Sequence, residues 1–229
     1  MFDALYLSPH FDDVVFSCGA SIVHRVKHGE RIVVVTVCAA LPPNEISPFA
    51  KSLHERWSGL GEFNRVEEDR RAIKHLGADY VHLNYPDCIY RRSLEGEWLY
   101  VSEESLWGDL SLSDVDRVEE LAQLIQHSAP LKPNAEIWSP FAIGDHVDHQ
   151  WVKLAASALG KMAKNPIRYY ADYPYAEKFI GGTRLPYDES DRLTKLKAIR
   201  CYTSQLSTFW RGDTAIIKAV NSWQERAIQ

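Results

Sequence analysis

The stretch at residues 6–20, YLSPHFDDVVFSCGA, decides the fold because a short apolar run meets a group of polar residues there. Residues 4–8 predict a short strand, and the apolar spacing within residues 19–28 predicts a helix. A turn or a helix cap uses one Asp or Asn at most. The histidine and the second aspartate between the two elements therefore indicate a role beyond local structure.

Strand-like and helix-like segments alternate along the rest of the chain. The run RIVVVTVCAA at residues 31–40 is apolar almost throughout, as in a strand that is buried on both faces. Further strands are predicted at residues 79–86, 135–140 and 167–175. Helices are predicted at residues 61–78, 113–127, 146–164, 189–206 and 214–229. Between them, residues 91–112 are irregular. The alternation predicts an α/β fold, a doubly wound and mainly parallel sheet, in a single domain over residues 1–229.

The composition restricts the classes of partner. A formal net charge of −5 and a pI near 6.0 leave no basic stripe for phosphate groups, so no nucleic-acid partner is expected. Four cysteines without CxxC spacing indicate neither a disulfide framework nor a thiolate zinc site, and they favour a cytoplasmic location. No apolar run reaches the roughly 20 residues of a membrane span, and Asp3 does not suit a signal peptide. The sequence does not indicate the oligomeric state.

Two polar clusters, SPHFDD and GDHVDHQ, each follow a predicted strand. In an open parallel sheet, sites form at the carboxyl ends of strands, so we expect the clusters to lie together. Two imidazoles and one carboxylate are typical ligands of a catalytic zinc. His10, Asp13 and either His146 or His149 form such a set, and the other histidine of that pair is then free to stabilise an oxyanion. Asp12 is placed to accept a proton from a water activated by the metal.

Each cluster alone also has a purely structural explanation. HFDD is typical of a capping turn, and an aspartate in HVDH interacts favourably with a helix dipole. Two such clusters after two buried strands of the same sheet favour the metal site over two separate caps.

Together these motifs resemble the LmbE-like, or PIG-L, deacetylases. SPHFDD followed by SCGA corresponds to the family's His-Pro-Asp-Asp-Glu signature, and HVDHQ corresponds to its His-x-Asp-His. RVEE at residues 65–68 matches Arg-x-x-Glu, Asp87 matches a loop aspartate, and Ser204-Gln205 matches a pair near the family's C-terminus. The resemblance implies a Rossmann-like, zinc-dependent enzyme that removes an acyl group, usually acetyl, from an amino-sugar nitrogen.

Roles follow from the resemblance position by position. It implies that zinc, with iron(II) and cobalt(II) as alternatives, is bound by three residues: His10, Asp13 and His149. Asp12 is then the general base, His146 the electrostatic stabiliser and acid, and Asp148 a support for one of the histidines. Arg65 and Asp87 correspond to residues that contact sugar hydroxyls. The structural alternatives are a surface ion pair for Arg65 and a turn after Pro86 for Asp87.

Three departures from the family pattern weaken any transfer of substrate identity. Phe11 stands where the family has proline, Val14 where it has glutamate, and Tyr202 where many members have histidine. Aromatic residues are frequent at residues 85–90, 98–107 and 170–176, where they suit either a sugar ring or a cover for the sheet.

The expected function is hydrolysis of the amide of a small-molecule N-acylated amino sugar or its glycoside. One alternative is the same chemistry on a non-sugar amide of a secondary metabolite. A second is a non-catalytic carbohydrate-binding protein on the same fold, against which the retained Asp12 argues. A nucleotide-binding enzyme is disfavoured because neither GxGxxG nor GxxxxGK[ST] occurs.

Overall fold

The computed structural model of the chain describes residues 1–57 and 64–228. Within these residues a seven-stranded sheet has the strand order β3-β2-β1-β4-β5-β7-β6. Its strands are β1 Phe2–Ser8, β2 Ile32–Thr36, β3 Asp79–His82, β4 Leu131–Pro140, β5 Ile167–Tyr170, β6 Thr183–Arg184 and β7 Arg226–Ile228. Strands β1 to β5 pair in parallel, and the two short strands at the edge pair antiparallel. The prediction of a doubly wound, mainly parallel α/β sheet is confirmed.

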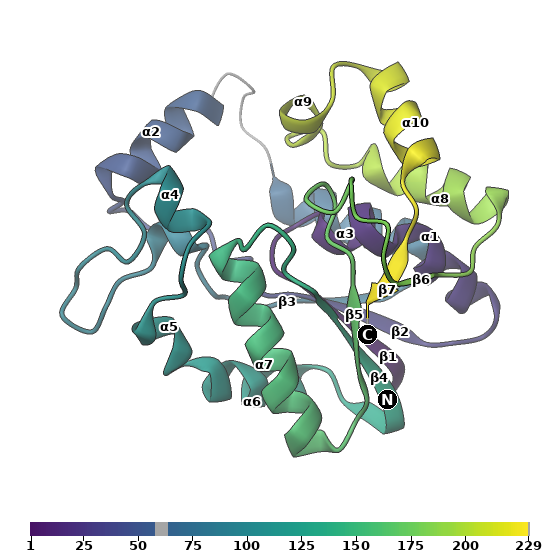
Figure 1. Ribbon diagram of the computed structural model, residues 1–229, viewed down its shortest axis with the longest axis horizontal. Helices are drawn as coiled ribbons and strands as arrows, with labels where there is room; N and C mark the ends of the chain where they lie inside the picture. The colour runs from purple at the N-terminus through teal and green to yellow at the C-terminus, as the bar shows by residue number, and fades with distance from the viewer. Residues whose placement is uncertain (58–63, 229) are drawn as a thin grey trace.

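Helices cover both faces of this sheet (Figure 1). The longer helices are α1 Asp13–Lys27, α2 Pro48–Trp57, α3 Arg65–Leu76, α6 Val118–Ser128, α7 Val147–Ala163, α8 Glu189–Ile199 and α10 Asp213–Ser222. Short turns of helix are α4 Glu103–Leu106, α5 Leu112–Val115, α9 Leu206–Phe209 and the 3₁₀ helix η2 Cys88–Tyr90. None of the helices in the described ranges combines the length and the apolar character that crossing a bilayer requires.

Alternating side chains of the central strands build two cores. Tyr6 of β1 and Val34 of β2 pack with α1, α3, α8 and α10 on one face, whereas Leu7 and Val35 pack with α6 and α7 on the other. Side chains on a strand alternate between the two faces of the sheet, so a strand whose two faces are both covered is almost entirely apolar. The fully buried IVVVT of β2 fits this rule.

Several predicted boundaries were wrong. Helix α1 begins at Asp13 rather than at residue 19. Residues 13–18 are all buried and so show no amphipathic pattern, which is why the sequence did not reveal this start. The strand predicted to end at Pro86 ends at His82, and the one predicted over residues 167–175 ends at Tyr170. After β3 the chain makes only an isolated bridge between Cys38 and Asn84, and after β5 the Asp172 carboxylate pairs with His149.

The predicted helices also differ in extent. The segment at residues 113–127 forms two helices, α5 and α6, and the segment at 189–206 is helical only to Ile199. The prediction at 61–78 is confirmed from Arg65 onward, with Gly77 closing the helix at φ 78°, while residues 61–63 lie outside the described residues. Helix α2 and the antiparallel edge strands were not predicted.

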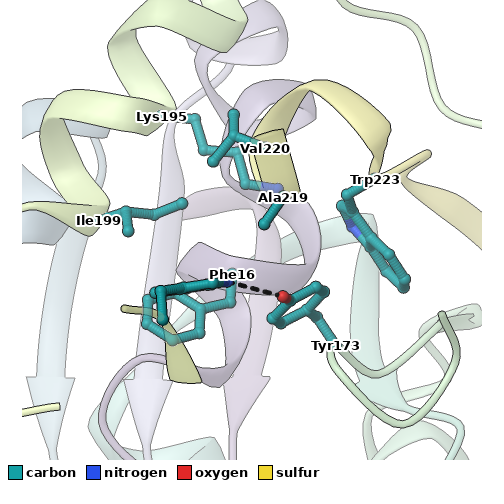
Figure 2. A pocket seen from close by; sticks show the side chains of 8 residues that line it. Phe16, Tyr173, Lys195, Ile199, Ala219, Val220 and Trp223 are labelled. Atoms are coloured by element: carbon teal, nitrogen blue, oxygen red, sulfur yellow. Dashed lines mark hydrogen bonds between the residues drawn. The ribbon is translucent and has the colours of Figure 1, made fainter. Parts of the chain in front are cut away.

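A buried ion pair fixes the C-terminal segment to α1. Lys195 Nζ lies 2.7 Å from Glu225 Oε1, and both side chains are almost fully buried. The Glu225 carboxylate also accepts hydrogen bonds from the backbone N–H groups of Ala20 and Ser21 at 2.9 and 2.7 Å. The aliphatic part of Lys195 lines a small apolar pocket with Phe16 and neighbouring residues (Figure 2). This pocket belongs to the core between α1, α8 and α10.

We predict that Lys195→Met destabilises the protein by about 3–5 kcal/mol, because it leaves the buried Glu225 carboxylate without its cation. Urea denaturation followed by circular dichroism measures the change. Lys197→Met is the matched control, since Lys197 is exposed on the same helix and should leave the free energy of unfolding nearly unchanged. Equal effects of the two substitutions would contradict the importance of the pair.

Candidate metal centre

A tight turn after β1 brings the first cluster to one point. The Ser8 hydroxyl donates to the His10 carbonyl at 2.7 Å and accepts from the Val14 N–H at 3.2 Å. The His10 N–H donates to Asp13 Oδ2 at 2.8 Å. Asp12 has a φ of 89°, a conformation that Asp and Asn tolerate better than most other residues. The turn therefore directs His10 and Asp13 toward the same point above the sheet.

The second cluster lies at the start of α7, after the short loop that follows β4. His146 is the N-cap residue, and its Nδ1 accepts a hydrogen bond from the Asp148 N–H at 3.2 Å. His149 lies one turn into the helix and is 1% exposed. Because β1 and β4 are adjacent parallel strands, their carboxyl ends place the two clusters side by side.

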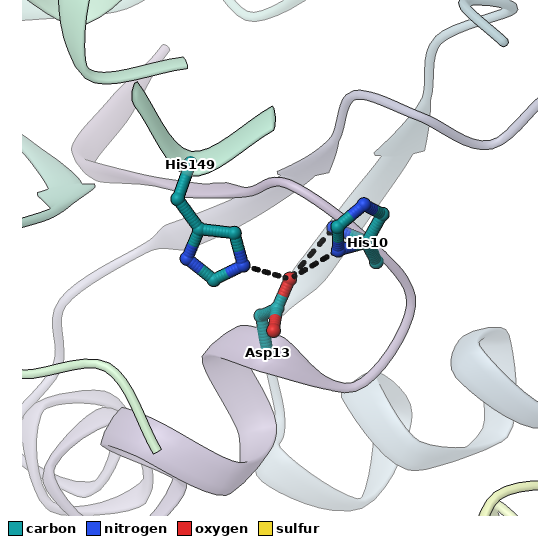
Figure 3. A group of neighbouring side chains, drawn as sticks. All are labelled: His10, Asp13 and His149. Atoms are coloured by element: carbon teal, nitrogen blue, oxygen red, sulfur yellow. Dashed lines mark hydrogen bonds and ion pairs between the residues drawn. The ribbon is translucent and has the colours of Figure 1, made fainter. Parts of the chain in front are cut away.

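Three donor atoms converge between the clusters (Figure 3). Asp13 Oδ2 lies 3.2 Å from His10 Nδ1 and 3.4 Å from His149 Nε2. His149 Nε2 is buried and makes no hydrogen bond within the described residues, the contact with Asp13 being only of ion-pair length. Nitrogen and carboxylate donors this close together fit a divalent metal ion. The spacing left His146 and His149 open, and the resemblance implied His149. His149 points into this set, whereas His146 Nδ1 already accepts a hydrogen bond from the Asp148 N–H.

Carboxylates behind both histidines fix their orientation. His10 Nε2 lies 2.8 Å from Asp148 Oδ2, and His149 Nδ1 lies 2.7 Å from Asp172 Oδ1. When each ring donates its N–H to the carboxylate behind it, its other nitrogen presents a lone pair toward Asp13. This tautomer assignment follows from the hydrogen-bond partners, and it prepares both rings to bind a cation.

Asp148 is held in turn by a buried arginine. Arg91 Nη1 pairs with Asp148 Oδ1, and Arg91 Nη2 lies 2.9 Å from Asp114 Oδ2. Asp148 Oδ2 also accepts from the Cys88 N–H at 3.1 Å. A carboxylate that already faces a guanidinium is a poor metal donor, so Asp148 fits the supporting role rather than that of a ligand.

Burial and neighbouring charges set the pKa values of the aspartate pair. Burial first, and then the adjacent Asp13 carboxylate, raise the pKa of Asp12 well above its usual value, while Arg65 opposes the rise. Burial also acts to raise the pKa of Asp13, but His149 and His10 lower it further than burial raises it. The two neighbouring carboxylates therefore differ: Asp13 remains ionised, and Asp12 is the more basic.

His146 is neutral near pH 7. Burial is the largest of the causes that lower its pKa to about 3. Since Nδ1 accepts a hydrogen bond from a backbone N–H, the single proton of the neutral ring is on Nε2. His146 is therefore a hydrogen-bond donor from Nε2, and an imidazolium at this position requires a proton that arrives during a reaction.

The two residues matched to sugar contacts lie at the edge of the centre. Asp87 Oδ2 is 3.7 Å from His10 Nε2, and Asp87 Oδ1 accepts from the Ile89 N–H at 3.2 Å, so Asp87 also makes the turn that the sequence offered as its alternative. Arg65 begins α3 and stacks over the Phe11 ring at 5.4 Å.

The weaker motifs of the resemblance meet in the interior. Glu68, the last residue of RVEE, accepts hydrogen bonds from the Ser204 hydroxyl and N–H at 2.5 and 3.0 Å. Tyr202 donates to Asp69 at 2.5 Å, and Val14 is fully buried in the core. These contacts join α3 to the segment after α8, so they support the fold around the site.

Sequence reasoning missed three residues of the centre: Arg91, Asp114 and Asp172. Arg91 and Asp114 lie in or beside the irregular segment, and Asp172 was included in a predicted strand. The polar Asp172 at the end of an apolar strand was the one available signal, because residues just after a strand are favoured site positions.

Comparisons with known proteins agree on one family. Residues 5–159 match the family model described as PIG-L, GlcNAc-PI de-N-acetylase. The chain is 28% identical over 186 residues to a 2'-N-acetylparomamine deacetylase of Niallia circulans and 31% identical over 177 residues to that of Streptomyces fradiae. Each alignment covers 75% of this chain, but the chain spans only 66% and 57% of the two relatives. The zinc-inhibited form of teicoplanin deacetylase superimposes with a TM-score of 0.79 at 28% identity, over 98% of this chain and 96% of that one.

We predict that Asp172→Asn lowers the affinity for a divalent metal by about 10- to 100-fold, because His149 loses the carboxylate that orients its ring. Isothermal titration calorimetry with zinc measures the affinity, and circular dichroism checks the fold. Asp116→Asn, at an exposed position, is the control and should bind zinc as the unaltered chain does. Unchanged affinity in a folded Asp172→Asn variant would exclude His149 as an oriented ligand.

Proposed function

This chain belongs to the PIG-L family, and on that premise we propose that it is a metal-dependent amide hydrolase acting on an N-acylated amino sugar or its glycoside. It removes the acyl group, acetyl in the simplest case, and leaves a free amine. The observation that carries the proposal is the buried Asp12 beside the converging donors of His10, Asp13 and His149. The names of its relatives, which are N-acetyl deacetylases, support the same reaction.

The three donors would hold a divalent cation, and we propose zinc, with iron(II) and cobalt(II) as alternatives. The zinc-inhibited form of the related teicoplanin deacetylase supports zinc binding in this family. Bound there, such an ion would polarise the amide carbonyl and lower the pKa of water.

Asp12 is the general base in this proposal. Its raised pKa makes this carboxylate a stronger base than an ordinary aspartate. It takes a proton from the attacking water while a bond forms between the water oxygen and the acyl carbon.

His146 stabilises the negative charge that develops on the acyl oxygen. Its Nε2–H is a prepared donor, because the Asp148 N–H holds the ring from the other side. When the C–N bond breaks, the departing nitrogen receives the proton that Asp12 took up, directly or through His146. The products are a carboxylate, acetate in the simplest case, and an amine.

Of the two alternative functions, the structure argues against a non-catalytic binding protein but not against hydrolysis of a non-sugar amide. A non-catalytic carbohydrate-binding protein has no need of Asp12 in a buried position with a left-handed backbone, so this alternative is disfavoured. Hydrolysis of a non-sugar amide uses the same centre, and substrate screening separates it from the proposed reaction.

We also propose that residues 1–229 form a single domain, which the shared sheet from β1 to β7 supports. A cytoplasmic location stays a prediction from cysteine usage.

We predict that Asp12→Asn lowers kcat by about 10²- to 10⁴-fold, because the amide cannot accept the proton of the water. Bound metal, measured by atomic emission, should stay at the level of the unaltered chain. Asparagine tolerates the positive φ of 89°, so the fold is preserved. Asp145→Asn is the matched control, an exposed aspartate that also has a positive φ, and it should keep full activity. Unaltered turnover in Asp12→Asn would contradict the role of Asp12 as the general base.

A chelator is expected to abolish amine release, and one equivalent of zinc, iron(II) or cobalt(II) is expected to restore it. Release is measured with an amine-reactive dye on N-acetylglucosamine glycosides and on non-sugar N-acetyl amides in parallel. The ion that restores the highest kcat/KM is the best candidate for the physiological metal. Full activity in protein shown by metal analysis to be free of metal would contradict the proposed function.

A further inference from the structure

Two partly exposed aromatic side chains stand over the two histidines of α7. Trp107, 41% exposed, has its ring centroid 4.9 Å from that of His146. Tyr175, 37% exposed, has its ring centroid 5.6 Å from that of His149. The Trp107 and Tyr175 rings are 5.3 Å apart. They come from separate loops, one after α4 and one after β5, so the fold brings them together at the candidate centre.

Gln150 fixes the Trp107 loop to the start of α7. Its Nε2 donates to the Gly108 carbonyl at 2.8 Å and to the Asp145 carbonyl at 2.6 Å. Gln150 directly follows His149 in HVDHQ, yet the proposed reaction gives it no role. The two bonds tie the residue after Trp107 to the helix that carries both histidines, so the indole has a defined place beside His146.

Tyr175 packs close to Gly144 and lies in the same loop as Asp172. Gly144 has a φ of 88°, which favours glycine, and a Cβ at this position would lie 3.1 Å from the Tyr175 side chain and crowd it. Asp172 Oδ1 pairs with His149, and Asp172 Oδ2 accepts from the Ile143 N–H at 3.2 Å. The loop that supports His149 from behind therefore also presents Tyr175 in front of it.

The two rings form a corner rather than a flat patch, because their planes meet at 67°. Partly exposed aromatic rings fixed at a polar centre are typical of binding sites, where they contact the C–H groups of a ligand. A pyranose ring has such C–H groups on its faces and edges, and its bulk suits a corner better than a flat surface. The Trp107 ring of this corner directly contacts the ring of His146, the proposed donor to the acyl oxygen.

We propose that Trp107 and Tyr175 form an aromatic corner that binds the pyranose ring carrying the N-acyl group, and that Gln150 positions Trp107 in it. This inference rests on the proposed function for its substrate class. The corner sets specificity: it selects N-acyl sugars over N-acyl amides that have no sugar ring.

The test measures binding separately from catalysis. In an Asp12→Asn background, calorimetry follows the binding of methyl N-acetyl-β-glucosaminide and of N-acetylethanolamine, which carries the amide without the sugar. Trp107→Leu should weaken glucosaminide binding about tenfold, which corresponds to about 1.4 kcal/mol. Trp107→Phe should recover part of this loss, and Gln150→Leu should lose a smaller share. Binding of N-acetylethanolamine should not change in any variant.

Trp98→Leu is the matched control. Trp98 lies in the same irregular segment, but its ring stacks on the Arg92 guanidinium at 3.6 Å, so its loss should leave glucosaminide binding unchanged. An equal loss in Trp98→Leu would assign the effect to the segment as a whole and overturn the proposal.

Three further outcomes would overturn it. They are an equal loss for both ligands in Trp107→Leu, no binding of the glucosaminide to the Asp12→Asn chain, and a loss that grows from N-formyl to N-butanoyl glucosaminide. The last outcome would place the acyl chain in the corner. A chain that releases no amine from any N-acetyl compound, while Trp107 still governs sugar binding, would refute the proposed function and leave the corner standing.

Discussion

The approach of one carboxylate oxygen to two imidazole nitrogens is the constraint on which the rest of the site depends. Asp13 Oδ2 can face His10 and His149 only because β1 and β4 are neighbours in the sheet and end at the same edge. Burying three groups of this kind is unfavourable unless each has partners. The surrounding structure supplies those partners, and in doing so it fixes the geometry of the centre.

Those partners form a chain of charges that reaches deep into the protein. His10 pairs with Asp148, Asp148 pairs with the fully buried Arg91, and Arg91 pairs with Asp114. Arg91 also stacks over the Trp151 ring at 4.9 Å, so the guanidinium has little freedom to move. On the other side Asp172 holds His149. A cation at the centre would thus be bound by rings whose orientation is set before it arrives, which reduces the reorganisation that binding requires.

Local pattern predicted the elements of this fold well and their ends poorly, for a reason visible in α8. The helical spacing continues to Leu206, yet the helix ends at Ile199 so that Tyr202 can reach Asp69 and Ser204 can reach Glu68. The same competition shortens β5, where Asp172 leaves the sheet to reach His149. Contacts between residues far apart in sequence outweigh a weak local preference for continuing the element.

The sequence by itself determined the parallel sheet, the family and the residues of the two clusters. A strand that is buried on both faces is apolar along its length, and metal ligands recur at fixed short spacings, so both can be recognised in a short stretch of residues. Only the tertiary structure decided that Arg91, Asp114 and Asp172 support the centre, and that Trp107 and Tyr175 meet above it. Asp114 lies in the single turn of α5 and the others lie in loops, where no repeating pattern constrains the side chain, and their partners are distant along the chain. Their roles appear only when the sheet brings the strand ends together.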